Sequence, residues 1–138
     1  MSVTQISVFV ESRPGHLTRA LETFSGNGVN VRGFSAADTG EYGIVRFIVD
    51  KPAEALELLR EAGAAVQASQ VLCVELEDRP GALESALATI ADKGINVVYC
   101  YSMMGTYIVL AVKDLEAAEA ALGATALKLV DQRDIERI

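Results

Sequence analysis

The chain has 138 residues, of which 51% are hydrophobic, and a formal net charge of −7 at pH 7. Its basic side chains are scattered among acidic ones, so there is no electrostatic footprint for nucleic acid. No apolar run approaches the length of a membrane span, and the N-terminus lacks the basic and apolar regions of a signal peptide. We therefore expect a compact cytoplasmic protein with neither a nucleic-acid nor a membrane partner.

The first half of the chain predicts the order strand, helix, strand, strand, helix, strand. Alternating apolar residues indicate the strands, and apolar residues at helical spacing indicate the helices. Pro14 and Pro52 suit helix starts, and Gly26 suits a helix end. The expected strands cover residues 6–10, 30–36, 44–49 and 65–69, and the expected helices run from Pro14 to Gly26 and from Pro52 to Ala62.

The second half repeats this order, at an offset of 66 residues through its first strand, helix and second strand. The segment Ser12-Arg13-Pro14-Gly15-His16-Leu17 corresponds to Asp78-Arg79-Pro80-Gly81-Ala82-Leu83. An asparagine follows sixteen residues after each proline, at Asn30 and Asn96. The offset falls to 63 by the third strand, because the second hairpin is three residues shorter. This pattern predicts a duplicated domain, with boundaries at 1–69 and 70–138.

A βαββαβ unit is the split-βαβ, ferredoxin-like motif, whose right-handed crossovers place both helices on one face of the sheet. We thus predict an α+β fold of two tandem ferredoxin-like domains with antiparallel sheets and helices on one face. The strand positions expected to face away from the helices are unusually apolar, which favours self-association as a homodimer. They are Phe9, Phe34, Ile44, Ile48, Val71, Cys73, Val98, Cys100, Val109 and Ala111.

Each Arg-Pro-Gly turn has two interpretations. As a purely structural feature it begins a helix, with Ser12 or Asp78 as the cap of the first amides. As a functional feature, the glycine lets a ligand approach the backbone, and free amides at a helix N-terminus accept an anionic group such as a carboxylate. Asn30 and Asn96 would add an amide donor and acceptor.

Enzymatic chemistry has no support in the sequence. His16 is the only histidine, and no serine or cysteine nucleophile has a second histidine as its base. Cys73 and Cys100 lack metal or redox spacing, so we expect buried or half-buried free thiols, no metal and no cofactor. The charged run 131–137 is interpreted as solvated surface, with a partner-docking tail as the alternative.

The doubled motif resembles the ACT domain, the small amino-acid-sensing module of biosynthetic enzymes, over nearly the whole chain. The resemblance rests on a strand, an (Asp/Ser)-Arg-Pro-Gly-x-Leu turn, a helix and a Gly-(Val/Ile)-Asn-Val segment. In this family amino acids bind where two ACT domains pair. Carried over by position, the ligand-binding residues are Asp78, Arg79, Gly81, Ala82, Leu83 and Asn96 in the second repeat and Ser12, Arg13, Gly15, His16, Leu17 and Asn30 in the first.

This resemblance implies a non-enzymatic regulatory protein that binds a free amino acid at the interface between paired ACT domains. We expect the Asp78–Leu83 loop with Asn96 to be the better-formed site, because Asp78 offers a carboxylate to a ligand ammonium group. The alternative is a ligand-independent interaction module or the regulatory subunit of a separately encoded metabolic enzyme.

Overall fold

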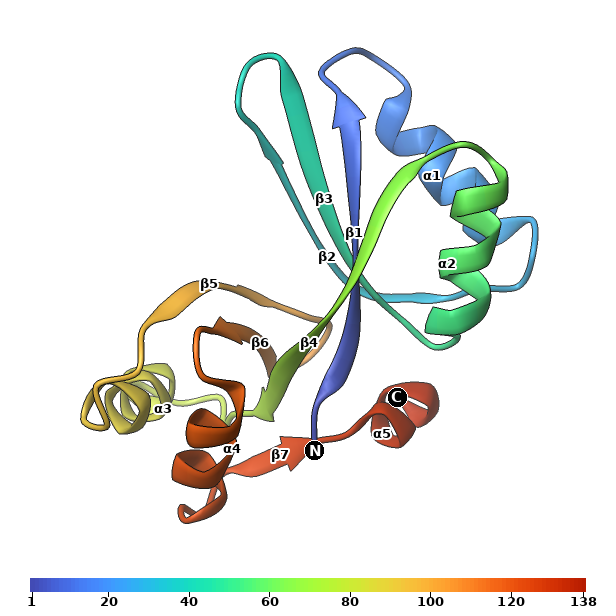
Figure 1. The fold of residues 1–138 in the computed structure, drawn as a ribbon. Coiled ribbons are helices and arrows are strands. Elements are labelled where there is room, and N and C mark those ends of the chain that lie inside the picture. Colours follow the sequence, from blue (N-terminus) through green and yellow to red (C-terminus); the bar gives the residue numbers. More distant parts are fainter. The chain divides into compact units, whose positions relative to one another are not determined.

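The computed structural model describes all residues from Met1 to Ile138 and contains seven strands and five helices in two compact units. Figure 1 shows their order along the chain. The elements are β1 (Val3–Glu11), α1 (His16–Ser25), β2 (Val31–Asp38), β3 (Tyr42–Val49), α2 (Pro52–Glu61), β4 (Ala65–Glu75), α3 (Ala82–Ala91), β5 (Val97–Ser102), β6 (Tyr107–Val112), α4 (Leu115–Gly123), β7 (Lys128–Val130) and α5 (Gln132–Arg137).

Each unit has the strand order of a ferredoxin-like fold. In the N-terminal unit, Thr4–Ser69 with Ile135–Ile138, the order is β2-β3-β1-β4. In the C-terminal unit, Gln70–Asp134 with Met1–Val3, the order is β7-β4-β6-β5. Two tandem α+β ferredoxin-like folds with antiparallel ladders are therefore confirmed. The assignment of residues 1–69 and 70–138 to separate domains stays a prediction.

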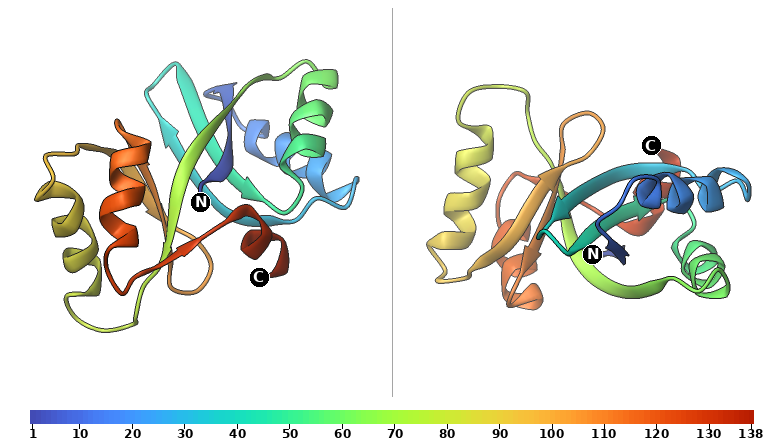
Figure 2. Two further views of the ribbon diagram at one scale, coloured as in Figure 1. Left: turned by 60° about the horizontal axis from the view of Figure 1, so that its bottom comes forward. Right: turned by 90° about the horizontal axis from the view of Figure 1, so that it is seen from above.

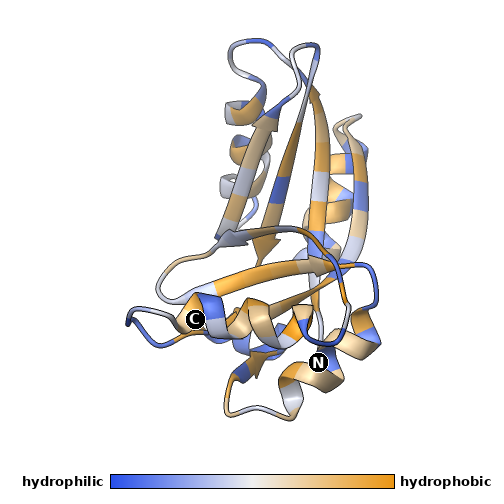
Figure 3. Cartoon of the chain, turned by 90° about the vertical axis from the view of Figure 1, so that its left-hand side faces the viewer, coloured by the Kyte–Doolittle hydropathy of each residue, from blue (hydrophilic) through white to orange (hydrophobic).

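The core of the N-terminal unit lies between one sheet face and the helices α1 and α2, which cover that face together in Figure 2. Phe24 of α1 meets Phe47 of β3 edge to face, with ring centroids 5.0 Å apart. Such a geometry contributes about 0.5–1.5 kcal/mol beyond the apolar area buried. The C-terminal unit repeats the arrangement with Ile90 of α3 and Leu122 of α4, both fully buried. Figure 3 shows the strands as largely hydrophobic and the turns as hydrophilic.

The strand predicted over residues 65–69 and the first strand of the second repeat, predicted over 72–76, form one continuous strand, β4, which ends at Glu75. Its first part belongs to the N-terminal unit and its second part, from Gln70, to the C-terminal unit. The sequence between them contains no glycine or proline that would end a strand. The prediction of two separate strands was wrong for this reason.

Two bulges correct the predicted sheet faces. Arg32 is the extra residue in β2, and Val98 is the extra residue in β5. Because directly paired residues share a face, Phe34 lies on the helix side with its partner Phe47, and Cys100 lies there with Leu110. A single extra residue reverses the face of every later side chain, and periodicity alone does not locate it.

Several of the remaining outward positions are buried within the single chain. Ile48, Cys73 and Val109 have no exposed surface, and Val71 is 1% exposed. The exposed large apolar side chains include Phe34 (57%), which lies on the edge strand β2. The homodimer therefore stays a prediction. Ile48 is buried within the chain and is not available to contact a second copy.

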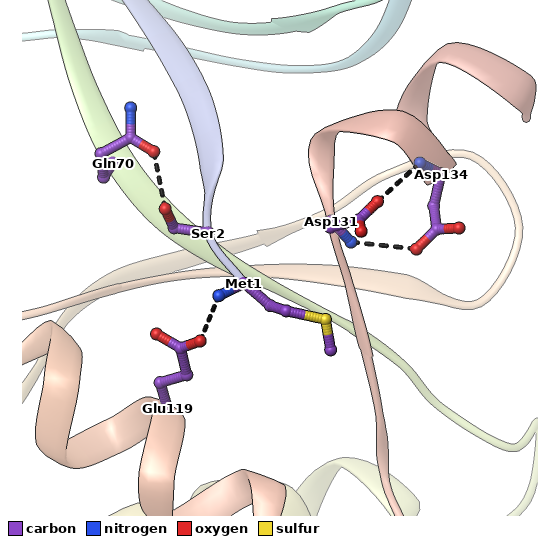
Figure 4. Close-up of polar contacts among 6 residues, drawn as sticks. All are labelled: Met1, Ser2, Gln70, Glu119, Asp131 and Asp134. Carbon is purple, nitrogen blue, oxygen red and sulfur yellow. Dashed lines mark hydrogen bonds and ion pairs between the residues drawn. The ribbon is translucent and has the colours of Figure 1, made fainter.

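The C-terminal run forms a short helix, α5, whose charged residues Arg133, Glu136 and Arg137 are exposed, as expected for solvated surface. The sequence did not predict the helix itself or the burial of Ile135. The Asp134 N–H donates to Asp131 Oδ1 (2.9 Å), and the Asp131 N–H donates to Asp134 Oδ2 (3.0 Å), a reciprocal capping box (Figure 4). The pKa of Asp131 is lowered chiefly by the hydrogen bond that its carboxylate accepts from the backbone N–H of Asp134. Hydrogen bonds with the Asp134 side chain and the Arg133 backbone lower it further. Ile135 is fully buried. One apolar residue in a charged run gives no periodicity to detect.

The N-terminus is also fixed within the C-terminal unit. The Met1 ammonium forms an ion pair with Glu119 of α4, and Ser2 Oγ donates to Gln70 Oε1 at 2.7 Å (Figure 4). Each end of the chain thus belongs to the unit built mainly from the other repeat. Each terminal segment therefore contributes to the stability of the unit that contains it. The repeat pattern of the sequence alone would have placed each segment in the other unit.

We predict that Ile135→Ala lowers the free energy of unfolding by about 2–5 kcal/mol, because it removes a fully buried aliphatic side chain. Urea denaturation followed by circular dichroism measures the change. The matched control is Arg137→Ala in the same helix, whose side chain is exposed and whose loss should matter by no more than about 0.5 kcal/mol. Equal stability of the two variants would mean that the helix behaves as a solvated tail.

Candidate ligand-binding turns

Both Arg-Pro-Gly turns place a glycine in the left-handed region immediately before a helix. Gly15 has φ +88° and is the N-cap of α1, and Gly81 has φ +85° and is the N-cap of α3. No side chain accepts a hydrogen bond from the first amides of either helix. Ser12 and Asp78, which the sequence predicted as caps, do not serve as caps. In α3 the first amide, Ala82 N–H, donates to the Arg79 carbonyl at 3.3 Å. The other first-turn amides of the two helices have no side-chain partner and can donate to an anionic group.

A Cβ built on Gly15 or Gly81 would meet nothing within 4 Å. The backbone conformation, not lack of room, is what requires glycine at these positions. The open space beside each glycine is what leaves the backbone accessible to a ligand.

The first turn lines a hollow of 420 Å³ on the N-terminal unit. In Figure 1 this turn and the β2–β3 hairpin lie at the same end of the unit. Two hydrogen bonds join them, from the Ser12 N–H to the Glu41 carbonyl (3.1 Å) and from Ser12 Oγ to Asp38 Oδ2. The lining residues are Val10, Glu11, Ser12, Arg13, Pro14, His16, Leu17, Ala36, Ala37, Asp38, Gly43 and Val45.

Asp38 is the charged residue of the hairpin that reaches this hollow. Its Oδ1 accepts the Gly40 N–H at 2.6 Å, and its Oδ2 accepts from Ser12. The hydrogen bond from Ser12, followed by that from Gly40, lowers the pKa of the carboxyl. Asp38 forms no ion pair, so its negative charge is not neutralised by a cationic side chain.

The other charged residues of the first turn interact with one another. Arg13 Nε donates to His16 Nε2, and the same nitrogen lies 3.8 Å from a carboxylate oxygen of Glu11. Arg13 and His16 also line a second hollow, of 460 Å³, beside the N-terminal part of β4. The sequence-predicted residues Ser12, Arg13, His16 and Leu17 are thus brought together around Gly15.

The second turn repeats the Arg–Glu pair and one of the two hollows of the first turn. Arg79 Nε forms an ion pair with Glu77 at 2.5 Å, and both line a hollow of 610 Å³ beside β7. Ala82 also lines this hollow and is 5% exposed, while Leu83 is 44% exposed. This hollow is formed by positions equivalent to those of the 460 Å³ hollow in the first repeat.

The shorter second hairpin does not extend as far along its turn. The last backbone hydrogen bond between the chain after β4 and this hairpin runs from the Leu76 N–H to the Thr106 carbonyl (2.9 Å). Leu76 lies two residues before Asp78. In the first repeat the corresponding bond reaches Ser12, which is equivalent to Asp78. Asp78 is exposed and is not covered by a residue equivalent to Asp38.

The two asparagines lie away from the turns of their own repeats. Asn30 precedes β2, at the far end of α1, where its N–H donates to Asp50 Oδ1 (2.9 Å) and its carbonyl accepts from the Asp50 N–H (3.2 Å). Asn96 precedes β5, and its carbonyl accepts the Lys113 N–H at 3.3 Å. A ten-residue helix is about 15 Å long, so neither asparagine shares a ligand with its own turn.

Other candidate groups do not form a site. No cluster of His, Cys, Asp and Glu side chains has the arrangement of metal ligands, and no helix is long and apolar enough to cross a membrane. Cys73 is buried, and burial, followed by the charge of Asp134, raises its pKa to about 12. Cys100 is exposed, contrary to the expectation of buried or half-buried thiols.

The fold and the doubled turns define a pair of tandem ferredoxin-like modules. The family model for the ACT domain pair matches residues 1–138. The chain belongs to this family. No curated protein matches the chain.

Solved structures agree with this assignment. Protein BT0572 from Bacteroides thetaiotaomicron superposes with a TM-score of 0.94 at 25% identity, covering 100% of this chain and 98% of that one. The ligand-free regulatory subunit of aspartate kinase from Thermus thermophilus gives 0.65 at 22% identity, covering 88% of each chain. The corresponding subunit from Thermus flavus gives 0.60 at 17% identity, covering 87% of this chain and 90% of that one. The two aspartate kinase subunits share the fold.

We predict that Gly15→Ala and Gly81→Ala each lower the free energy of unfolding by about 1–2 kcal/mol, because alanine is strained at positive φ. Gly123→Ala is the matched control. Gly123 lies in the last turn of α4, and an added Cβ would meet nothing there, so alanine should stabilise the chain by about 0.5–1 kcal/mol. If all three substitutions had the same sign, conformational strain would not be the role of the turn glycines.

We predict that Ser12→Ala raises the pKa of Asp38 towards its ordinary value, 3.8, because the hydrogen bond from Ser12 is the largest cause of its lowering. A carboxyl with a lowered pKa stabilises the fold above its unfolded pKa, and this contribution is lost as the pH falls through the folded pKa. Carboxyl ¹³C NMR titration measures the change. Asp131 is the internal reference, since its lowered pKa depends on Asp134 and Arg133, and only Asp38 should respond.

Proposed function

We propose that this chain is a non-enzymatic regulatory protein that binds a free amino acid between paired ACT domains. The observation that carries the proposal is the doubled helix N-terminus, with a left-handed glycine cap and no side-chain cap in either repeat. Backbone amides at such an end bind an anionic group such as the ligand carboxylate, and the hollow beside the first turn gives it space.

The separation of each asparagine from its own turn supports a site between domains. A ligand that contacts Ser12 and Gly15 in one ACT domain cannot reach Asn30 of the same domain, which lies at the other end of α1. Asn30 or Asn96 would therefore complete a site whose turn belongs to another ACT domain. A homodimer, with four ACT domains in the assembly, supplies the necessary pairs.

A regulatory role is supported by the family and by the nature of its relatives. The Thermus thermophilus structure is that of a regulatory subunit of aspartate kinase, and the present chain has the same fold. We propose that ligand binding changes how this chain associates with a metabolic enzyme in the cytoplasm. The turns use polar and backbone groups for binding, with no nucleophile–base pair, so the proposal includes no catalysis and no cofactor.

The second candidate is a ligand-independent interaction module or enzyme subunit. The observation that favours it is the exposed apolar surface on edge strands, with Phe34 of β2 57% exposed and Val98 of β5 55% exposed. Edge strands with such side chains pair with other chains readily. In this candidate the Arg-Pro-Gly turns only begin helices.

The two candidates differ in a thermal-shift measurement with each of the twenty amino acids. A ligand at a hundred times its Kd stabilises the folded protein by about 2.7 kcal/mol. We expect a shift with one chemical group of amino acids, and a dimer by sedimentation velocity in the presence of that ligand. No shift with any amino acid at 10 mM, or a monomer at about 50 µM protein with the ligand saturating, would contradict the proposal.

Calorimetry on Asn30→Ala and Asn96→Ala then ranks the two repeats. The sequence predicts the larger loss of affinity for Asn96→Ala. A larger loss of affinity for Asn30→Ala would reverse this ranking, because the asparagine of the better-formed site would then be Asn30.

A further inference from the structure

The first hollow carries an excess of negative charge. Glu11, Asp38 and Arg13 are its charged residues, two acids against one base. Arg13 lies 3.8 Å from Glu11 and donates to His16, so its charge is already offset close by. The Asp38 carboxylate has no cationic partner, which makes the hollow complementary to a cation or to the ammonium end of a zwitterion.

The carboxylate is also held in a defined orientation. Ser12 donates to one oxygen of Asp38, and the Gly40 N–H donates to the other at 2.6 Å. A carboxylate has about four acceptor positions, so two such bonds leave acceptor capacity for another donor. An ammonium group offers up to three N–H donors and is the cationic group of every free amino acid.

The remaining surface of the hollow is mainly small and apolar. Val10, Leu17 and Val45 contribute aliphatic side chains, and Gly43 contributes none. Apart from the charged residues, the side chains of Ser12 and His16 are the polar side chains of this lining, and each is already hydrogen-bonded, Ser12 to Asp38 and His16 to Arg13. No unpaired charge other than that of Asp38 is available for a charged ligand side chain.

The geometry points to Asp38 as the residue that binds the ligand ammonium group in the first repeat, and to a small aliphatic amino acid as the ligand. This inference rests on the proposed amino-acid-binding function and specifies its ligand and the residue that recognises it. It also applies to one repeat only. At the position 66 residues after Asp38 the chain has Met104, which is 65% exposed and carries no charge.

Asp38→Asn tests this assignment, since it keeps the shape of the side chain and removes its charge. The probes are L-valine and L-alanine, measured by calorimetry at pH 7 and low salt. We expect the substitution to weaken binding of both at the first site by at least tenfold, as for a lost hydrogen bond to a charged group. Glu41→Gln is the matched control, because Glu41 is an exposed acid of the same hairpin that does not line the hollow. It should change affinity by less than twofold.

A second measurement needs no variant and so does not depend on the folding of Asp38→Asn. Isovalerate and propionate have the carboxylate and aliphatic groups of valine and alanine without the ammonium group. We expect each acid to bind the unmodified protein at least tenfold more weakly than its amino acid.

The outcomes separate this inference from the function on which it rests. If valine or alanine binds and Asp38→Asn binds it within twofold of the unmodified protein, or if the acids bind as tightly, the assignment of Asp38 is overturned while amino-acid binding stands. If neither valine nor alanine binds but another amino acid does, the predicted ligand class is overturned. If none of the twenty amino acids binds, both proposals fall.

Discussion

The conformation of one glycine in each repeat decides the local structure on which the candidate sites depend. Gly15 and Gly81 turn the chain at positive φ from the end of a strand into a helix. An L-residue with a side chain is strained in this conformation, and a Ser, Asp or Asn in the usual N-cap geometry would have occupied the first amides. A glycine cap therefore leaves these donors accessible, at the cost of the stabilisation that a side-chain cap contributes.

The repeat made most of the fold predictable from the sequence. Two copies of the same strand, turn and helix pattern gave independent support to each element, and the strand order followed from the ferredoxin-like motif. The features that were missed have no periodic signal. The helix around Ile135 has a single buried apolar residue, and the bulges at Arg32 and Val98 each consist of one extra residue in an apolar strand. Tertiary packing and pairing register determine these features.

The candidate site was predictable in part. The residues around Gly15 were identified because they are adjacent in sequence, and the structure places most of them around one hollow. Asp38 was not identified as a site residue, because its contact with Ser12 spans 26 positions and depends on the length of the hairpin between them. The position of Asn30 at the far end of the unit follows from topology. A helix that returns antiparallel to β1 necessarily separates the turn at its start from the asparagine after its end.

The difference in hairpin length between the repeats has a physical consequence for recognition. In the first repeat the longer hairpin bonds to the turn through Ser12, and one of these bonds holds the Asp38 carboxylate at the hollow that the turn lines. In the second repeat the carboxylate, Asp78, belongs to the turn itself, and the hairpin bonds end two residues earlier at Leu76. Under the proposed function, a bound zwitterion would align its carboxylate with the helix amides and its ammonium group with the acid. Since the acid occupies different positions in the two repeats, the same amino acid cannot adopt the same pose in both. Duplication has thus preserved the glycine-capped helix start while the hairpin changed the position of the acidic residue. Under the proposed function, the two turns would therefore present different charge arrangements to a ligand.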